Sequence, residues 1–174
     1  IVHTSGTTGI DALEGSSSKI GVFYPLQTFS KDKSIDFRQI PIAIEGNTPE
    51  VASIIHAIAD RLSEKVFELR SEQRKVLHVA AVFACNFTNH LFSLSQELLT
   101  GQNLDFDLLL PLINETANKV QLNDPITMQT GPAIRGDQST INVHLDLLAG
   151  KPELKDLYQK LSQSIVNLQE RSQG

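Results

Sequence analysis

The chain has 174 residues, of which 40% are hydrophobic and 20% charged, with a formal net charge of −5. This composition is typical of one large or two small globular domains, and the acidic balance argues against nucleic acid or an anionic membrane as the main partner. No apolar run approaches the roughly 20 residues that span a bilayer. The single cysteine, Cys85, excludes an internal disulfide and suits a reducing, cytoplasmic compartment.

Short strands are predicted in the first third of the chain. The chain opens on a segment that resembles the end of a strand rather than on methionine, so we expect residues to precede Ile1 in the full-length protein. The runs Ile20–Tyr24 and Ile40–Ile44 are rich in β-branched residues, are bounded by Gly, Ser, Asn and Asp, and predict two strands. Val66–Leu69 predicts a further short strand.

One helix is predicted between these strands. Thr48 is a suitable cap, and Pro49 suits the first helical position. The residues expected on its apolar face are Val51, Ile54, Ile55, Ile58 and Leu62. Strands that alternate with a helix predict the edge of an α/β domain over residues 1–69.

From Ser71 onward the pattern is helical only, which places a domain boundary near residue 70. A helix from Ser71 to about Leu99 is apolar nearly all round between Val76 and Phe87, so we expect a central buried helix. A second helix is predicted over Phe106–Val120, with Pro111 near its start or at a kink. A third is predicted from its cap, Asp137, to about Leu148. The last is an amphipathic helix whose apolar residues are Leu154, Leu157, Tyr158, Leu161, Ile165 and Leu168.

Four segments occur in a characteristic order: VHTSG from Val2, YPLQTF from Tyr24, AVFACN from Ala81 and TGPAIRGD from Thr130. Together they resemble a bacterial family of NADP oxidoreductases in which a Rossmann-like domain precedes a helical domain of unknown function. More distantly, the chain is similar to pyrroline-5-carboxylate reductases, ketopantoate reductases and deazaflavin-dependent NADP oxidoreductases.

The resemblance implies a fold and an activity. Residues 1–69 would be the last strands of the dinucleotide-binding domain, and residues 70–174 a helical domain like the C-terminal domain of 6-phosphogluconate dehydrogenase, through which such proteins often dimerise. The activity would be NADP-dependent hydride transfer to or from a small carbonyl or imine substrate. No GxGxxG occurs among the ten glycines, so this chain lacks the usual pyrophosphate loop. The family usually has histidine where this chain has Tyr24.

Thr4, Ser5 and Gly6 are the candidate cofactor-binding residues. They follow a strand, at the carboxyl edge where cofactors bind in parallel sheets, and Ser5 would approach the nicotinamide. A polar turn between a strand and a helix explains them equally well. The same residues begin TSGTTG, which resembles the phosphate loop of adenylate-forming enzymes, but Ile10 and Asp11 replace the usual Pro and Lys and the chain is too short for that fold.

His78 and Asn86 are the candidate catalytic residues. Eight helical residues place their directions about 80° apart, so both can border one cleft. Related hydroxyacid dehydrogenases carry a lysine where this chain has Val82, and His78, one turn earlier, would replace it as proton donor while Asn86 orients the substrate. The alternative is that both are bonded to neighbouring helices inside a bundle.

Gln27, Thr130 and Arg135 are the candidate substrate-binding residues. The Gln27 amide suits a carbonyl or carboxamide group, although it can equally bond its own backbone. Arg135 can clamp a carboxylate or phosphate, or pair with Asp137. The five histidines and one cysteine show no spacing typical of a metal site. A non-catalytic dimerisation or ligand-sensing module that has kept the oxidoreductase fold is the alternative function.

Overall fold

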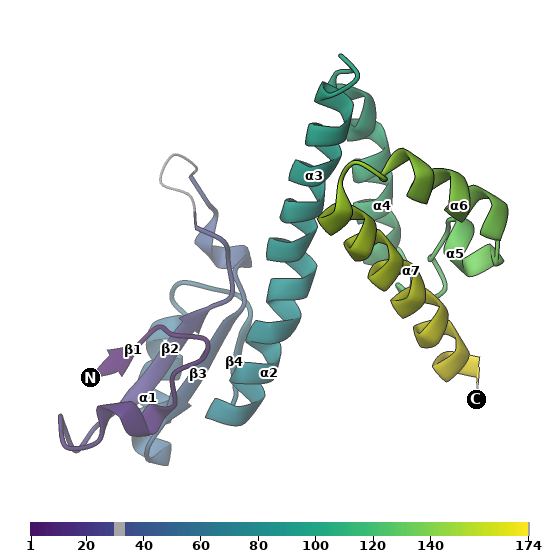
Figure 1. Cartoon of the computed structure of the whole chain (residues 1–174). Coiled ribbons are helices and arrows are strands. Elements are labelled where there is room, and N and C mark those ends of the chain that lie inside the picture. Colours follow the sequence, from purple (N-terminus) through teal and green to yellow (C-terminus); the bar gives the residue numbers. More distant parts are fainter. Residues whose placement is uncertain (30–33, 174) are drawn as a thin grey trace. The chain divides into compact units, whose positions relative to one another are not determined.

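The computed structural model of the chain describes residues 1–29 and 34–173 (Figure 1). By its internal contacts the chain divides into two compact units, Ile1–Gly101 and Gln102–Gly174. The long helix that begins at Ser71 therefore belongs, by contacts, with the sheet. The predicted boundary near residue 70, which marks the change from strands to helices along the sequence, stays a prediction.

The first unit contains a four-stranded sheet in the order β1-β2-β3-β4. Its strands are β1 (Val2–His3), β2 (Gly21–Pro25), β3 (Ile42–Gly46) and β4 (Val66–Glu68), which confirms the predicted strands. The pairs β1/β2 and β3/β4 are parallel, and β2/β3 is antiparallel. The carboxyl ends of β1 and β2 consequently lie at one edge of the sheet, and those of β3 and β4 at the opposite edge.

Helix α1 (Pro49–Ala59) covers one face of the sheet. Thr48 caps it, since its Oγ1 accepts a hydrogen bond from the backbone of Val51 at 3.3 Å. The core on this face consists of Ile42, Ile44, Val51, Ile55 and Ala59. The expected apolar face was partly wrong: Ile54 and Ile58 are half exposed, because the helix turns Ala52 and Ala59 toward the strands instead. Leu62 is also exposed, and it lies beyond the end of the helix at Ala59.

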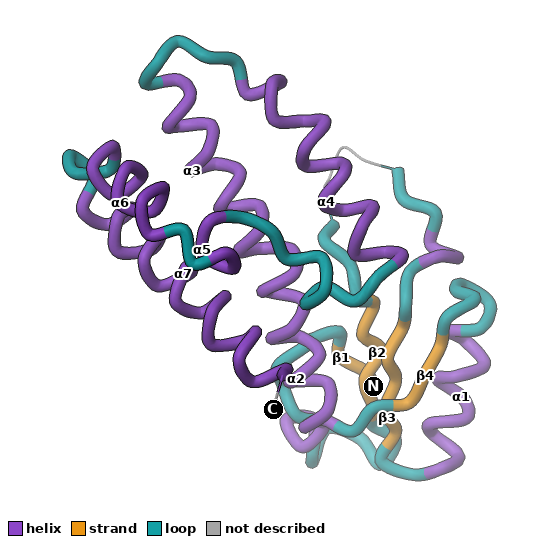
Figure 2. The backbone as a smooth tube through the Cα atoms, turned by 90° about the vertical axis from the view of Figure 1, so that its right-hand side faces the viewer, coloured by secondary structure: helices purple, strands orange, loops and turns teal. Residues whose placement is uncertain are grey.

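The other face of the sheet carries Val22, Tyr24 and Ala43. This follows from the pleat, because successive side chains alternate between the faces. Figure 2 shows helix α2 (Ser71–Ala81) on the opposite side of the sheet from α1. The short 3-10 helices η1 (Ile10–Leu13) and η2 (Phe37–Gln39) complete the regular elements of the sheet region.

The long helix is interrupted by a π-helix. After α2, the segment Val82–Phe87 forms π-turns, and α3 (Thr88–Thr100) continues beyond it. The hydroxyl of Thr88 donates to the carbonyl of Phe83, five residues earlier, at 3.2 Å. The helix predicted from Ser71 to about Leu99 is therefore confirmed, and six of its residues form π-turns. Such π-segments occur frequently at functional sites.

The expected burial of this helix is also wrong. Arg74 is the only buried residue of Ser71–Thr100, all of which the structure describes. The sheet is short, so it covers only the first turns of the helix. The exposed large apolar side chains are Val76, Val79, Phe83, Phe87, Leu91 and Leu98.

By length and composition the segment Ser71–Thr100 also meets the criterion for a membrane span, with a mean hydropathy of 1.2 over its best 18-residue window. This corrects the expectation that no segment comes near that length. A single helix that meets this criterion is weak evidence, because the criterion considers only length and composition. The segment contains the polar residues His78, Asn86, Asn89 and His90, which are expensive to place in lipid.

The second unit is helical. It contains η4 (Phe106–Leu109), α4 (Leu110–Leu122), α5 (Pro132–Arg135), α6 (Gln138–Leu147) and α7 (Pro152–Gln173), and α5 contacts both α6 and α7. Asp137 caps α6 as predicted, since its carboxylate accepts from the backbone of Thr140 at 3.0 Å. The structure is thus a small mixed sheet with helices, followed by a helical region. This confirms the predicted fold class, a Rossmann-like α/β edge followed by a helical domain.

Candidate active site

Three of the predicted site residues line one hollow in the first unit. Gln27, His78 and Asn86 border a cavity of about 120 Å³. Its other lining residues are Tyr24, Leu26, Thr28, Ala81, Val82 and Cys85. The hollow lies where β2 ends, beside the last turn of α2 and the π-helix, so polar groups from a loop and a helix meet between apolar walls.

The loop after β1 lies against the same histidine. Gly6 is buried, and a Cβ atom at this position would clash with Nδ1 of His78 and lie 3.0 Å from Cζ of Tyr24. The backbone therefore approaches the imidazole as closely as a glycine allows. Since β1 and β2 are parallel neighbours, their following segments, Thr4–Gly6 and Leu26–Thr28, lie at the same edge of the sheet.

His78 is hydrogen-bonded to a tyrosine. Oη of Tyr24 lies 3.0 Å from Nδ1 of His78, and the two rings meet edge to face with their centres 6.1 Å apart. Burial raises the pKa of the Tyr24 phenol, and the positive charge of Arg74 opposes this in part. The phenol therefore keeps its proton at neutral pH.

A buried arginine holds the loop in place, and it was not predicted. Arg74 lies one turn before His78 on α2 and is fully buried. Its guanidinium donates to the carbonyl of Ser5 at 3.2 Å and to the carbonyl of Thr8, and it forms an ion pair with Glu45. One side chain thus ties α2 to the loop after β1 and to the end of β3.

Glu45 also anchors the start of α2. Its carboxylate accepts from the backbone N–H of Ser71 at 3.0 Å and from the Ser71 hydroxyl at 2.7 Å. The Ser71 hydroxyl in turn accepts from the backbone of Ile10 at 3.1 Å. A carboxylate at a helix N-terminus is favourable because the first N–H groups and the helix dipole are positive there. The histidine is therefore presented by a fixed helix end.

The side chain of Ser5 is hydrogen-bonded to the residues that follow it in the loop. Its Oγ accepts from the backbone of Thr8 at 3.0 Å, from the Thr8 hydroxyl at 2.8 Å and from the backbone of Thr7 at 3.3 Å. These contacts agree with the structural explanation of the loop, and they leave the hydroxyl hydrogen of Ser5 available to a ligand. The cofactor-binding role of Thr4, Ser5 and Gly6 stays a prediction.

Thr130 and Arg135 lie in the second unit, whereas His78 lies in the first. Both are exposed, and they flank a turn in which Gly131 and Gly136 have φ values of 111° and 64°, which favour glycine. The pKa of Asp137 is lowered mainly by the hydroxyl of Thr140, with a smaller contribution from Arg135. No ion pair of Arg135 occurs in the described part of the chain.

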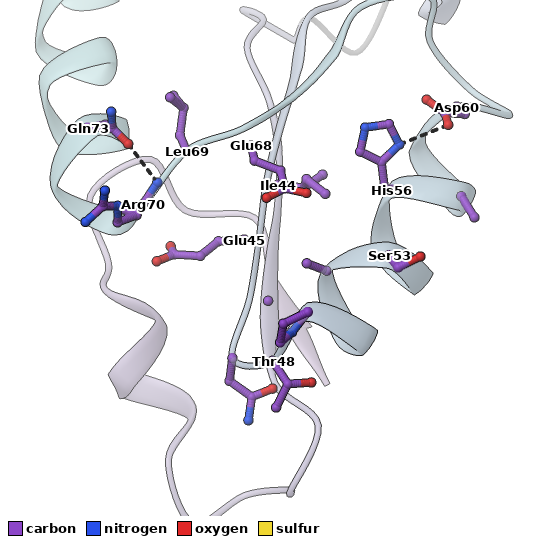
Figure 3. A pocket seen from close by; sticks show the side chains of 15 residues that line it. Ile44, Glu45, Thr48, Ser53, His56, Asp60, Glu68, Leu69, Arg70 and Gln73 are labelled. Carbon is purple, nitrogen blue, oxygen red and sulfur yellow. Dashed lines mark hydrogen bonds and ion pairs between the residues drawn. The ribbon is translucent and has the colours of Figure 1, made fainter.

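A larger groove lies elsewhere on the first unit (Figure 3). It has a volume of about 860 Å³, is bounded by the ends of β3 and β4, and contains none of the predicted site residues. Some of its charged groups are already paired: His56 pairs with Asp60 at 2.9 Å, and Glu45 pairs with Arg74. We place the candidate site at the smaller hollow, where three of the predicted residues meet. Oε1 of Gln27 accepts a hydrogen bond from the backbone of Thr28 at 2.8 Å, so its NH₂ group is the part left for a ligand.

Over residues 1–29 and 34–173 no three or more His, Cys, Asp or Glu side chains gather in a way that would hold a metal ion.

Replacing Gly6 with alanine is expected to disturb the site. The added methyl group would displace the His78 ring, and such overpacking costs about 1–3 kcal/mol of unfolding free energy. Urea unfolding of the variant measures this loss. Gly150→Ala is the matched control, because a Cβ there has no neighbour within 4 Å. Equal stability of the two variants would show that the loop is not packed on His78 in solution.

Comparison with known proteins agrees with this fold. A search of the curated proteins finds no match. Among solved structures, the putative NADP oxidoreductase BF3122 from Bacteroides fragilis is 52% identical, with a TM-score of 0.90 over 94% of this chain and 63% of that protein. Protein TM1727 from Thermotoga maritima is 26% identical, with a TM-score of 0.80 over 99% of this chain and 70% of that protein.

The present chain thus spans less than two thirds of the length of the Bacteroides protein. The family model described as "Domain of unknown function (DUF2520)" matches residues 40–165, which include His78, Asn86, Thr130 and Arg135. Because this match covers most of the chain, the protein belongs to the DUF2520 family.

Proposed function

We propose that this chain is part of an NADP-linked oxidoreductase that transfers hydride between the nicotinamide and a small carbonyl or imine compound. The observation that carries the proposal is the convergence of Gly6, Gln27, His78 and Asn86 from separate segments at the carboxyl edge of the parallel strands β1 and β2. Cofactors bind at this edge in open α/β sheets. The name of the 52%-identical Bacteroides protein supports the same activity.

The residues present fit one end of the cofactor. The loop Thr4–Gly6 brings backbone and hydroxyl groups to the sheet edge, and the exposed amide of Gln27 lies on the adjacent loop, so a carboxamide-bearing nicotinamide has partners there. None of the ten glycines forms a GxGxxG loop, so the pyrophosphate would be held by residues outside this chain. The choice of NADP over NAD would also be made there.

The chain's own residues supply the remaining chemistry. When bound, NADPH would supply the hydride that adds to the substrate carbon as the C=O or C=N π bond breaks. His78 would donate the proton that the oxygen or nitrogen then needs, and would remove it in the reverse direction. The amide of Asn86 would donate a hydrogen bond that orients the reacting group, while Leu26 and Val82 limit access of water.

Arg135 and Thr130 would bind an anionic group of the substrate or cofactor from the second unit. In the full-length enzyme Arg135→Ala is expected to raise KM by about 10-fold or more while kcat changes little, because a contact made equally in ground and transition states is lost. Steady-state kinetics measure this. Lys160→Ala, which removes an exposed pair with Asp156 on α7, is the control. A fall in kcat at unchanged KM would contradict a binding role.

The activity is tested with the full-length protein in a thermal-shift screen against NADPH, NADH and a panel of small carbonyl and imine metabolites. We expect NADPH to raise the melting temperature, and at least one compound to oxidise it as followed by absorbance. If neither cofactor binds while a metabolite does, the chain belongs to a ligand-sensing module and the oxidoreductase proposal fails.

We also propose a homodimer built from the helical domain, residues 70–174, and a cytoplasmic location. Large apolar side chains remain exposed on α3 (Leu91, Leu98) and on α7 (Leu161, Leu168), and such surfaces favour association. Light scattering at tens of micromolar is expected to give twice the 19.2 kDa chain mass. A single-chain mass would contradict the dimer.

A further inference from the structure

We infer that Tyr24 is a positioning residue that holds neutral His78 in the tautomer with its hydrogen on Nε2, so that Nε2 is the atom offered to a ligand. The inference concerns the same hollow, and only its catalytic consequence rests on the proposed function. Oη of Tyr24 and Nδ1 of His78 are 3.0 Å apart. Nε2 of His78 has no hydrogen-bond partner among the described residues.

The direction of this hydrogen bond follows from the surroundings of Tyr24. The side chain is 9% exposed, and Nδ1 of His78 is the only hydrogen-bond partner of its hydroxyl in the described part of the chain. If Nδ1 carried the hydrogen, the phenol hydrogen would have no acceptor among the described residues, which is costly for a residue with so little exposure. The phenol therefore donates, Nδ1 accepts, and the imidazole hydrogen lies on Nε2.

The same pair tolerates a change of protonation. A hydroxyl both donates and accepts. When His78 takes up a second proton, Nδ1–H donates and the phenol oxygen accepts, so the ring need not move. The ring is further restrained by the backbone of Gly6, which packs against Nδ1. Tyr24 and Gly6 therefore let Nε2 gain and lose a proton at one fixed position, as an acid–base group requires.

The arrangement also limits what binds there. Among the residues that line the hollow, His78 is the only one with a basic side chain. A neutral Nε2–H and the amides of Gln27 and Asn86 are hydrogen-bond donors in a partly apolar cavity. They suit a carbonyl oxygen or imine nitrogen as the hydrogen-bond acceptor at this position.

The test is imidazole NMR on the 174-residue chain labelled with ¹⁵N-histidine. Long-range ¹H–¹⁵N correlation separates protonated from unprotonated ring nitrogens, and His78→Gln assigns the His78 signals among the five histidines. At a pH where His78 is neutral we expect protonated Nε2 and unprotonated Nδ1. Tyr24→Phe should convert His78 to a tautomer mixture.

Tyr158→Phe is the matched control. It removes an analogous contact, Oη of Tyr158 to Nδ1 of His144 at 2.8 Å in the second unit, and should leave the His78 signals unchanged. Two results would overturn the inference regardless of any activity. One is a protonated Nδ1 of His78 in the unsubstituted chain, and the other is that the Tyr24→Phe variant gives the same His78 signals as the unsubstituted chain.

Kinetics separate this inference from the proposed function. In the full-length enzyme Tyr24→Phe should lower kcat by about 10- to 100-fold at nearly constant KM, because the proton donor is misplaced rather than lost. If the NMR result holds but His78→Ala keeps full turnover, the catalytic proposal fails while the tautomer assignment stands.

Discussion

Arg74→Met is expected to lower the free energy of unfolding by about 3–5 kcal/mol, the usual result of removing one partner of a buried ion pair. The substitution keeps an unbranched side chain of good helix propensity, so the loss reports on the guanidinium. It leaves the carbonyls of Ser5 and Thr8 without their donor and Glu45 without its counter-charge. Total stabilities are about 5–15 kcal/mol, so this is a large fraction.

The measurement is urea unfolding of the 174-residue chain at neutral pH. Lys75→Met, at the next position on α2, is the control: it removes an exposed pair with Glu72 at 2.9 Å, and such pairs contribute about 0–1 kcal/mol. A loss for Arg74→Met no greater than that of the control would show that the buried network does not stabilise the fold. A double-mutant cycle with Glu45→Gln isolates the coupling between Arg74 and Glu45.

His78→Ala is expected to lower kcat by about 100-fold or more in the full-length enzyme, the scale for loss of general acid–base catalysis. The variant should still fold. It also leaves the buried Tyr24 hydroxyl without its acceptor, which costs about 1–3 kcal/mol of unfolding free energy. Turnover and melting temperature are therefore both measured.

His90→Ala is the control for this prediction, because His90 is an exposed histidine on α3 outside the hollow. It should change neither quantity much. Near-normal turnover of His78→Ala, together with a lower melting temperature, would show that His78 is a structural histidine. The proton donor would then have to be sought in another residue.

Local signals in the sequence were sufficient to predict where most helices and strands begin and end. Thr48 and Asp137 cap helices as predicted, because a short polar side chain reaches the free backbone N–H groups within its own turn. The strands follow from β-branched residues between turn residues. Both kinds of signal act over a few neighbouring residues, so no knowledge of the tertiary structure is needed.

Arg74 was missed because its partners are distant along the chain. The segment from Ser71 to Lys75 is polar and resembles a solvated first turn of a helix. The structure buries Arg74 by bonding it to residues 69 and 66 positions away. The available signal was its spacing: Arg74, His78 and Val82 recur every four residues and share the face that meets the sheet and the hollow.

The π-helix was missed for a different reason. Apolar periodicity reports which face of a helix is buried, and it does not distinguish a few π-turns within an α-helix. The angle of about 80° between His78 and Asn86 was calculated for a regular α-helix, and the π-turns between them change it. Both residues nevertheless line the hollow, as expected. The role of Tyr24 also depended on the fold, since its contact with His78 joins residues 54 positions apart.

The most direct test of the central proposal is a crystal structure of the full-length protein with NADP⁺. We expect the nicotinamide ring to lie against Thr4–Gly6, with its reactive carbon facing the hollow lined by His78 and Asn86. A nicotinamide bound elsewhere, for example in the groove lined by Thr48, Ser53 and Asp60, would contradict the assignment of this hollow as the site of hydride transfer.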